Sequence, residues 1–185
     1  MRRVRYQVAC SLDGYIAGPR GEFDWIVMDP EIDFEAQFAQ FDTLLMGRRT
    51  YEAVEAEGSR WPGKQFVVFS RTLQASARPW VRIVSGDPVP VVAELKAQPG
   101  KDIWLFGGGE LFRSMLDAGC VDTVELAVIP ILLGGGIPML PSPARRRSLK
   151  LTSYRAFRSG IVLLEYAVLQ ATSEHDGQAS AVPAQ

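Results

Sequence analysis

Short apolar runs alternate with helical patterns along most of the chain, and this alternation is the strongest constraint on its fold. The runs that predict buried strands are residues 5–10, 43–46, 65–69, 81–84, 103–106, 121–129, 149–157 and 161–169. Because strands and helices alternate up to residue 120, we expect a three-layer α/β fold with a mostly parallel central sheet. Arg158, Ser159 and Gly160 join the last two runs and predict an antiparallel C-terminal strand in a hairpin at the end of the sheet.

Several segments between these runs have the pattern of an amphipathic helix. The first is expected to begin at Asp29, which precedes Pro30, and to present Phe34, Phe38 and Phe41 on one face. The other helices are expected at residues 50–57, with Thr50 as the N-cap, and at 88–97 and 109–118. Together they would cover both faces of the sheet.

The composition predicts one globular domain. The chain has 185 residues, of which 47% are hydrophobic, so it can bury one substantial core. We expect a single domain over residues 1–170 and a tail at 171–185 whose small polar residues predict disorder. The net charge of −1 gives no basic excess for nucleic acid or an anionic membrane surface. No long apolar run or signal-like segment is present, so we expect a cytoplasmic protein.

The positions of the cysteines and of the histidine limit the kinds of catalytic and metal site that the chain can form. Cys10 and Cys120 lie in apolar runs, where reduced thiols serve as core residues, so we expect neither a disulfide nor a metal site. The only histidine, His175, lies in the tail, which leaves catalytic triads, Cys-His pairs and zinc-binding helices without a base or ligand. If the chain is an enzyme, a cofactor, carboxylates or backbone groups must carry the chemistry.

Polar or glycine-rich segments follow three of the predicted strands at the point where each strand ends. They are Gly47, Arg48, Arg49 and Thr50; Ser70 and Arg71; and Gly107, Gly108 and Gly109. Ligands of open α/β sheets bind beyond the carboxyl ends of the strands, and arginines beside helix-start amides are suited to several phosphates on one ligand. Each segment alone is typical of an ordinary turn or a solvated helix start, but their coincidence at one edge favours a binding site.

The motifs of the chain, taken in order, resemble those of the dihydrofolate reductase-like superfamily. The resemblance is to the group related to the C-terminal reductase domain of the bifunctional riboflavin-biosynthesis deaminase/reductase. The motifs are SLDGYIAG at 11–18, LLMGRRTYE at 44–52, VVFSRTL at 67–73, IWLFGGGEL at 103–111 and VIPILLGGGIPML at 128–140. The resemblance covers residues 3 to about 169, and it implies a dihydrofolate reductase-like fold that binds NADPH.

The resemblance also implies which residues would contact NADPH. They are Ala17, Gly47, Arg48, Arg49, Thr50, Ser70, Arg71, Gly107, Gly108, Gly109, Glu110 and Leu111. Residues 47–50 would lie along the phosphates, and Ser70 with Arg71 would hold the 2′-phosphate of the adenosine. Gly107 and Gly108 would form a cis peptide bond beside the nicotinamide and the pyrophosphate, a conformation that glycine adopts most easily.

The loop after the first strand would cover the nicotinamide and part of the substrate. The residues implied on the substrate side are Ser11, Asp13, Asp24 and Trp25. Asp13 is the candidate catalytic residue, because the proton that accompanies hydride transfer would come from a carboxylate such as this one or from water. The alternative for Asp13 and Gly14 is a simple turn after the first strand.

The implied activity is NADPH-dependent hydride transfer to a small heterocycle or sugar-amine, as in 5-amino-6-(5-phosphoribosylamino)uracil reductases. Tyr15 stands where riboflavin-pathway reductases commonly carry lysine, and the GRRTYE segment is more similar to the folate enzyme. The acidic residue that binds the pterin in dihydrofolate reductases has only loose candidates here, Asp33 and Glu35. Reduction of a pterin and a non-catalytic nucleotide-binding module therefore remain as alternatives.

Two further features concern assembly and loops. The apolar run at 161–169 predicts self-association, and we expect a homodimer. The glycines at 134–136 predict a wide turn near the mouth of the site. The basic cluster at 145–147 is typical of a solvated loop, with recruitment of a phosphorylated substrate as the alternative.

Overall fold

The computed structural model describes residues 1–58, 61–74, 76 and 78–169. The predicted tail at 171–185, with His175, lies outside the described residues. The elements in chain order are β1 (Val4–Ser11), β2 (Tyr15–Ala17), α1 (Phe34–Phe38), β3 (Phe41–Gly47), α2 (Arg48–Ala56), β4 (Gln65–Phe69), β5 (Val81–Val84), α3 (Pro88–Ala97), β6 (Asp102–Gly107), α4 (Gly109–Asp117), β7 (Thr123–Ile129), β8 (Ile137–Pro138), β9 (Leu149–Ala156) and β10 (Val162–Val168).

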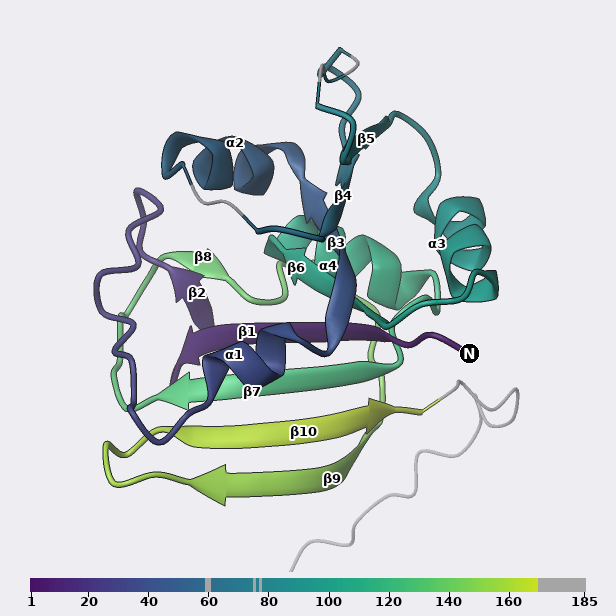
Figure 1. Cartoon of the computed structure of the whole chain (residues 1–185). Coiled ribbons are helices and arrows are strands. Elements are labelled where there is room, and N and C mark those ends of the chain that lie inside the picture. The colour runs from purple at the N-terminus through teal and green to yellow at the C-terminus, as the bar shows by residue number, and fades with distance from the viewer. Residues whose placement is uncertain (59–60, 75, 77, 170–185) are drawn as a thin grey trace, which may run out of the picture.

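An eight-stranded sheet forms the centre of the molecule, in the order β5-β4-β3-β6-β1-β7-β10-β9 (Figure 1). The first six strands in this order, β5, β4, β3, β6, β1 and β7, run parallel to one another. Strand β10 is antiparallel to both β7 and β9. A separate antiparallel ladder pairs β2 with β8. The predicted α/β fold, with a mostly parallel sheet and a final antiparallel hairpin, is confirmed.

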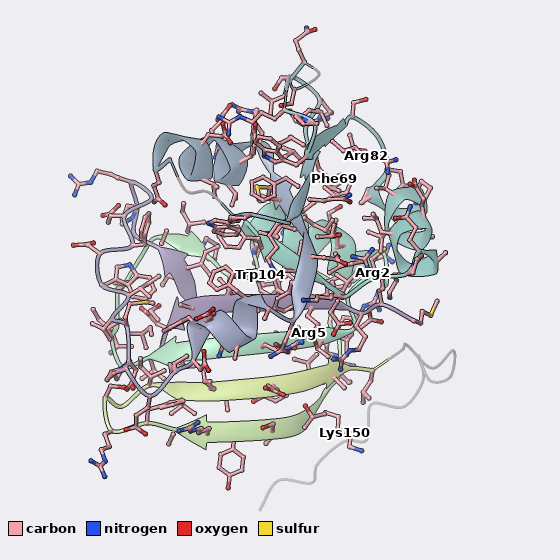
Figure 2. The ribbon with its side chains drawn as sticks, viewed as in Figure 1. Arg2, Arg5, Phe69, Arg82, Trp104 and Lys150 are labelled. Carbon is pink, nitrogen blue, oxygen red and sulfur yellow. The ribbon has the colours of Figure 1, made fainter. Side chains whose placement is uncertain are left out.

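Helices cover both faces of the parallel part of the sheet because successive side chains of a strand point to opposite faces. On one face, Leu105 of β6 belongs to the same core cluster as Leu95 of α3 and Phe112 of α4. Its neighbour Trp104 belongs to the cluster on the other face, with Val54 of α2 (Figure 2). Burial of these apolar side chains is the main stabilising contribution to this three-layer arrangement.

The predicted start of the first helix was wrong. Helix α1 begins at Phe34, and its N-cap is Asp33, whose carboxylate accepts a backbone hydrogen bond from the first turn. Asp29 instead forms a turn before the helix, where its carboxylate accepts a hydrogen bond from the amide of Glu31. Phe41 is the first residue of β3, not part of α1. The helical spacing continued across this boundary because Phe41 packs in the same apolar cluster as the helix.

Helix α2 also begins earlier than predicted. Its first residue is Arg48, and Gly47 is the N-cap, so Thr50 lies within the first turn. The threonine hydroxyl suggested a cap, but the chain turns from β3 into the helix without a loop. Helix α3 has its predicted bounds, and α4 ends within one residue of the prediction.

Both cysteines are buried, as predicted for core residues, and burial raises the pKa of the Cys10 thiol to about 11. Such a thiol carries no thiolate at neutral pH and is a poor nucleophile. In the part of the chain that the structure describes, no group of three or more His, Cys, Asp or Glu side chains could hold a metal ion. None of the helices within these residues is long and apolar enough to cross a membrane.

A buried ion pair links two central strands near their amino ends. Two nitrogens of the Arg5 guanidinium in β1 donate to the two carboxylate oxygens of Glu125 in β7, each over 2.7 Å. These side chains are only 9% and 7% exposed. Arg5 also donates to Gln40 over 2.6 Å and lies over the ring of Phe41, and Glu125 accepts a hydrogen bond from Thr123. The pair is therefore desolvated and closely surrounded by partners.

Candidate functional site

Two helices begin side by side at the carboxyl edge of the sheet. Helix α2 follows β3, α4 follows β6, and these two strands are paired neighbours. The N-caps are Gly47 and Gly108, and neither caps its helix with a side chain, so the first-turn amides have no side-chain acceptor among the described residues. The hydroxyl of Thr50 in α2 lies 3.6 Å from where a Cβ on Gly108 would be. Both helix starts therefore border one space, and their amides and positive dipole ends are suited to phosphate.

The glycines at this edge leave space against the backbone. The peptide bond between Gly107 and Gly108 is cis, as the resemblance implied, and Gly107 has a φ of 124°. A Cβ added to Gly47 or Gly107 would meet no atom within 4 Å. A Cβ added to Gly109 would instead lie 2.5 Å from the carbonyl oxygen of Pro138. Gly47 and Gly107 thus allow a ligand to approach closely, whereas Gly109 allows the protein's own chain to do so.

A hollow of about 300 Å³ lies beyond the ends of β4 and β5. Its lining residues are Phe69, Ser70, Arg71, Val84, Ser85, Gly86, Pro88, Leu111 and Ser114. Ser70 is buried, and its hydroxyl oxygen accepts hydrogen bonds from the amides of Thr72 and Leu73 over 3.2 and 3.0 Å. Arg71 is exposed and forms no ion pair with any other residue that the structure describes. A guanidinium without a carboxylate partner, beside serine hydroxyls, is suited to a further phosphate.

The two arginines at the start of α2 differ in whether a carboxylate pairs with them. Arg48 donates to Glu52, one turn further along the helix, over 2.9 Å, and its side chain is 41% exposed. Arg49 is exposed and, among the described residues, has no carboxylate partner. Arg49 is therefore the more available of the two for an anionic ligand, since Arg48 would first have to release Glu52.

The carboxylate of Asp13 joins the loop after β1 to the loop after β7. It accepts hydrogen bonds from the Ser11 hydroxyl over 2.6 Å and from the amides of Leu133 and Gly134 over 3.1 and 2.7 Å. The Ser11 oxygen is buried and also accepts a hydrogen bond from the amide of Tyr15. The hydrogen bonds from Ser11, Gly134 and Leu133 lower the pKa of the Asp13 carboxyl below its ordinary value. At neutral pH this carboxylate is charged and has no proton to donate.

The ladder of β2 and β8 lies against the start of α4. Ala17 of β2 pairs with Ile137 of β8, and a Cβ on the preceding Gly136 would overlap the carbonyl oxygen of Ala17. The next residue after β8, Met139, has its carbonyl oxygen 2.9 Å from where a Cβ on Gly109 would be. Ala17 is therefore connected, through β8 and the carbonyl group of Met139, to Gly109 at the glycine-rich edge of the sheet.

Trp25 and Asp24 lie in the loop between β2 and α1, where the carbonyl of Glu22 accepts a hydrogen bond from the amide of Gly18, the residue after β2, over 2.8 Å. The Trp25 ring packs against an apolar cluster formed by Ile32, Ile129, Phe157 and Ile161. Its indole nitrogen donates to the carbonyl of Glu22 over 3.2 Å. Asp24 is exposed. The ring is therefore largely committed to packing between the loop before α1 and the β9–β10 hairpin.

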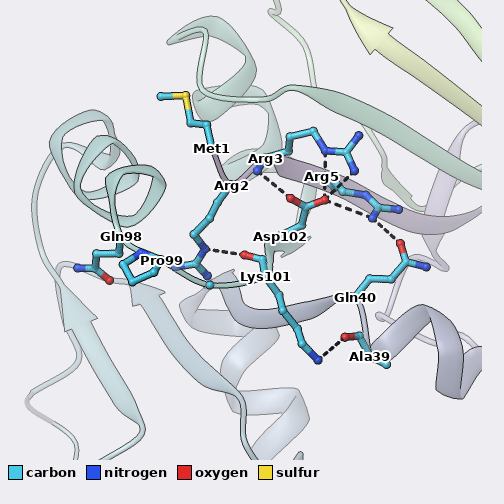
Figure 3. A pocket seen from close by; sticks show the side chains of 11 residues that line it. Met1, Arg2, Arg3, Arg5, Ala39, Gln40, Gln98, Pro99, Lys101 and Asp102 are labelled. Atoms are coloured by element: carbon cyan, nitrogen blue, oxygen red, sulfur yellow. Dashed lines mark hydrogen bonds and ion pairs between the residues drawn. The ribbon is translucent and has the colours of Figure 1, made fainter.

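Another hollow, of about 510 Å³, lies at the opposite edge of the sheet, near the amino ends of β1 and β6 (Figure 3). It is lined by three arginines, each paired with a carboxylate, and by Lys101, whose ammonium group donates to the carbonyl of Ala39. Arg2 pairs with Asp42, while Arg3 and Arg5 both contact Asp102. This hollow is built around a charge network that stabilises the fold, so we do not take it as the candidate site.

The sequence reasoning missed two parts of the site. Ser85 and Gly86 line the hollow after β5, and they follow a strand in the same way as the three segments that were recognised. The same rule applied to this fourth strand exit could have found them. Pro138 and Met139, which contact the start of α4, carried no local signal because the contact depends on the distant β2–β8 pairing.

Comparisons with known proteins show the family of the chain. The family model described as the RibD C-terminal domain matches residues 2–163. The Bacillus subtilis protein YyaP is 35% identical over 178 residues, which cover 89% of this chain and 94% of YyaP. The riboflavin biosynthesis protein RibD of Mycobacterium tuberculosis is 29% identical over 150 residues, which cover 72% of this chain. The matched part is 44% of that RibD, so the chain corresponds to less than half of it.

Solved structures give the same result. A Shewanella protein described as a riboflavin biosynthesis protein has a TM-score of 0.80 at 28% identity, over 92% of this chain and 100% of its own. The Thermotoga maritima diaminohydroxyphosphoribosylaminopyrimidine deaminase/5-amino-6-(5-phosphoribosylamino)uracil reductase has a TM-score of 0.68 at 18% identity. That match covers 91% of this chain and 57% of the Thermotoga chain, and it shows a shared fold.

Proposed function

The chain belongs to the RibD C-terminal domain family, and on this premise we propose that it is an NADPH-dependent reductase of the riboflavin-biosynthesis type. Its substrate would be a small heterocycle or sugar-amine such as 5-amino-6-(5-phosphoribosylamino)uracil. The observation that supports NADPH most strongly is the position of Leu111. This residue lies in the first turn of α4 and also lines the hollow that contains Arg71. One ligand with a pyrophosphate and a separate phosphate would fit both places.

NADPH, when bound, supplies the hydride. In our proposal the first-turn amides of α2 and α4 bind the pyrophosphate, with Arg49 beside them, and Ser70 and Arg71 bind the 2′-phosphate. Gly47 and Gly107 leave the space that the dinucleotide would need against the backbone. Since Asp13 is deprotonated at neutral pH, we propose that water delivers the proton to the substrate.

Titration with NADPH and with NADH tests the proposal, with the quenching of the protein's four tryptophans as the signal. We expect a dissociation constant at least about tenfold lower for NADPH, because only NADPH carries the 2′-phosphate. Equal affinity for the two cofactors would contradict the 2′-phosphate assignment, and no binding of either would contradict the reductase proposal. Binding without oxidation across pyrimidine ribosylamines and pterins would instead favour a non-catalytic module.

Replacing Arg71 with alanine is expected to weaken NADPH binding by roughly 10- to 100-fold, since a hydrogen bond to a charged group contributes about 1.5–3 kcal/mol. NADH has no 2′-phosphate, so its dissociation constant should change by less than about twofold. Arg49→Ala is the matched control. It should weaken both cofactors by similar factors, because the pyrophosphate is common to them. The same titration measures both variants, and equal losses of NADPH and NADH in Arg71→Ala would contradict the assignment.

We also propose that the protein is a homodimer formed through the face of the C-terminal hairpin that is exposed among the described residues. All residues of β9 are exposed, and on one face of the hairpin Leu151 pairs with Tyr166 and Tyr154 pairs with Leu164. Leu151 is 47% exposed and Tyr154 is 72% exposed. An apolar face of this kind is suited to burial against an identical copy.

The double variant Leu151→Lys and Tyr154→Lys is expected to abolish this dimer, because burying lysines at an apolar interface is costly. Light scattering coupled to size-exclusion chromatography should give about twice the chain mass of 20.4 kDa for the wild type and one chain mass for the variant. Ser153→Lys is the control, since Ser153 lies between them on the same strand and pairs with Glu165. A wild type that elutes as a monomer would contradict the proposal.

A further inference from the structure

We propose that Asp13 is a positioning residue: its carboxylate ties the loop after β1 to the loop after β7 and so fixes the β2–β8 ladder over the start of α4. The inference rests on the proposed function, because the ladder would then form one wall of the cofactor site. It gives Asp13 a role different from proton transfer to the substrate.

Three hydrogen-bond donors converge on the carboxylate of Asp13. The Ser11 hydroxyl and the amides of Leu133 and Gly134 all donate to it, over 2.6, 3.1 and 2.7 Å. A further hydrogen bond, from the amide of Leu12 to the carbonyl of Ile131 over 2.9 Å, joins the same two loops beside it. Three donors aimed at two oxygens of one side chain describe a tie between segments.

Hydrogen bonds and close contacts connect this tie to the proposed cofactor site. The residue after Asp13, Gly14, accepts a hydrogen bond from the amide of Met139 over 2.9 Å. Met139 and Pro138 in turn present their carbonyl oxygens to Gly109, the first residue of α4. If the loop after β7 were released from Asp13, β8 and these two carbonyl groups would lose their fixed distance from the amides of α4.

The tie requires a carboxylate and not only a side chain of this shape. Asparagine has the same size, but only one of its two terminal atoms accepts hydrogen bonds. In Asp13→Asn, the NH₂ group would face one of the donors now made by Ser11, Leu133 and Gly134. The variant therefore removes at least one hydrogen bond of the tie with little change of volume, whereas Ser11→Ala removes one donor and also the acceptor of the Tyr15 amide.

The experiment measures the affinity of each variant for two ligands and the rate of its amide hydrogen exchange. NADPH spans the whole proposed site, whereas adenosine 2′,5′-bisphosphate occupies only the hollow with Arg71. In Asp13→Asn we expect NADPH to bind roughly tenfold more weakly, while the bisphosphate changes by less than about twofold. Hydrogen exchange should become about tenfold faster at the amides of Leu133 and Gly134. Ser11→Ala should act in the same direction, and Glu57→Gln, an exposed carboxylate on another loop, should change none of the three.

The outcomes distinguish a failure of this inference from a failure of the proposed function. Equal weakening of NADPH and the bisphosphate would mean a general structural defect and would overturn the inference, as would unchanged exchange at Leu133 and Gly134. Unchanged NADPH binding with faster exchange would also overturn it, because the tie would then have no effect on the site. If the wild type binds no NADPH, the proposed function fails and the inference fails with it. If the wild type binds NADPH normally and Asp13→Asn changes nothing, only the inference fails.

Discussion

Replacing Arg5 with methionine is expected to lower the free energy of unfolding by about 3–5 kcal/mol, because removal of one partner leaves a buried charge without compensation. Glu125 is almost fully buried, and it would retain the Thr123 hydroxyl as its remaining hydrogen-bond donor among those described here. The variant would also lose the contact of the guanidinium with Gln40 and with the ring of Phe41. Chemical denaturation of wild type and variant, followed by tryptophan fluorescence, measures the difference.

A second substitution separates the cost of the lone charge from the value of the pair. In the double variant Arg5→Met and Glu125→Met, both partners are apolar, and we expect stability within about 2 kcal/mol of the wild type. Arg82→Met is the matched control, since Arg82 and Glu94 form a pair in which both side chains are 47% exposed. That change should cost less than about 1 kcal/mol. A loss in Arg5→Met no larger than in Arg82→Met would show that the buried pair does not hold β1 to β7.

Replacing Gly109 with alanine is expected to cost about 1–3 kcal/mol of stability and to weaken NADPH binding, because the added methyl group has no space. It would lie 2.5 Å from the carbonyl oxygen of Pro138 and 2.9 Å from that of Met139. Both obstacles are backbone atoms, so β8 and the start of α4 must move apart. Denaturation measures the first effect, and the NADPH titration measures the second.

Gly47→Ala is the control, because a Cβ at Gly47 meets no protein atom within 4 Å. Its cost in stability should stay below about 1 kcal/mol, which reflects only the poorer N-cap. The methyl group would nevertheless project into the space assigned to the dinucleotide, so NADPH binding should weaken. If Gly47→Ala binds NADPH as the wild type does, the dinucleotide does not approach this backbone, and the assignment of Gly47 is wrong.

Much of the fold could be predicted because strands buried on both faces appear as continuous apolar runs. The runs at 43–46 and 103–106 lie within β3 and β6, which are largely buried on both faces. The first helix was misplaced because the spacing of its phenylalanines runs on into β3, where Phe41 packs in the same cluster. β2 and β8 were not predicted because each is short, and pairing between distant parts of the chain defines both.

The site was predictable to the extent that it follows strand ends. Gly47, Ser70 and Gly107 all lie where parallel strands end, which the sequence pattern can locate. The partners of Asp13 could not be found in this way. Its amide donors, Leu133 and Gly134, are 120 and 121 residues further along the chain, so a local pattern shows only a turn.

The place of β1 in the sheet has a consequence for synthesis of the protein. Among the strands of the sheet, β1 is synthesised first, and it lies in the middle of the sheet, between β6 and β7. Val4 and Tyr6 of β1 are fully buried in the finished fold. Until residue 129 has emerged, the nascent chain must keep this apolar strand unpaired on at least one side, and such a segment is prone to aggregate. We therefore expect truncated nascent chains that end before β7 to bind chaperones, with release once β7 has emerged.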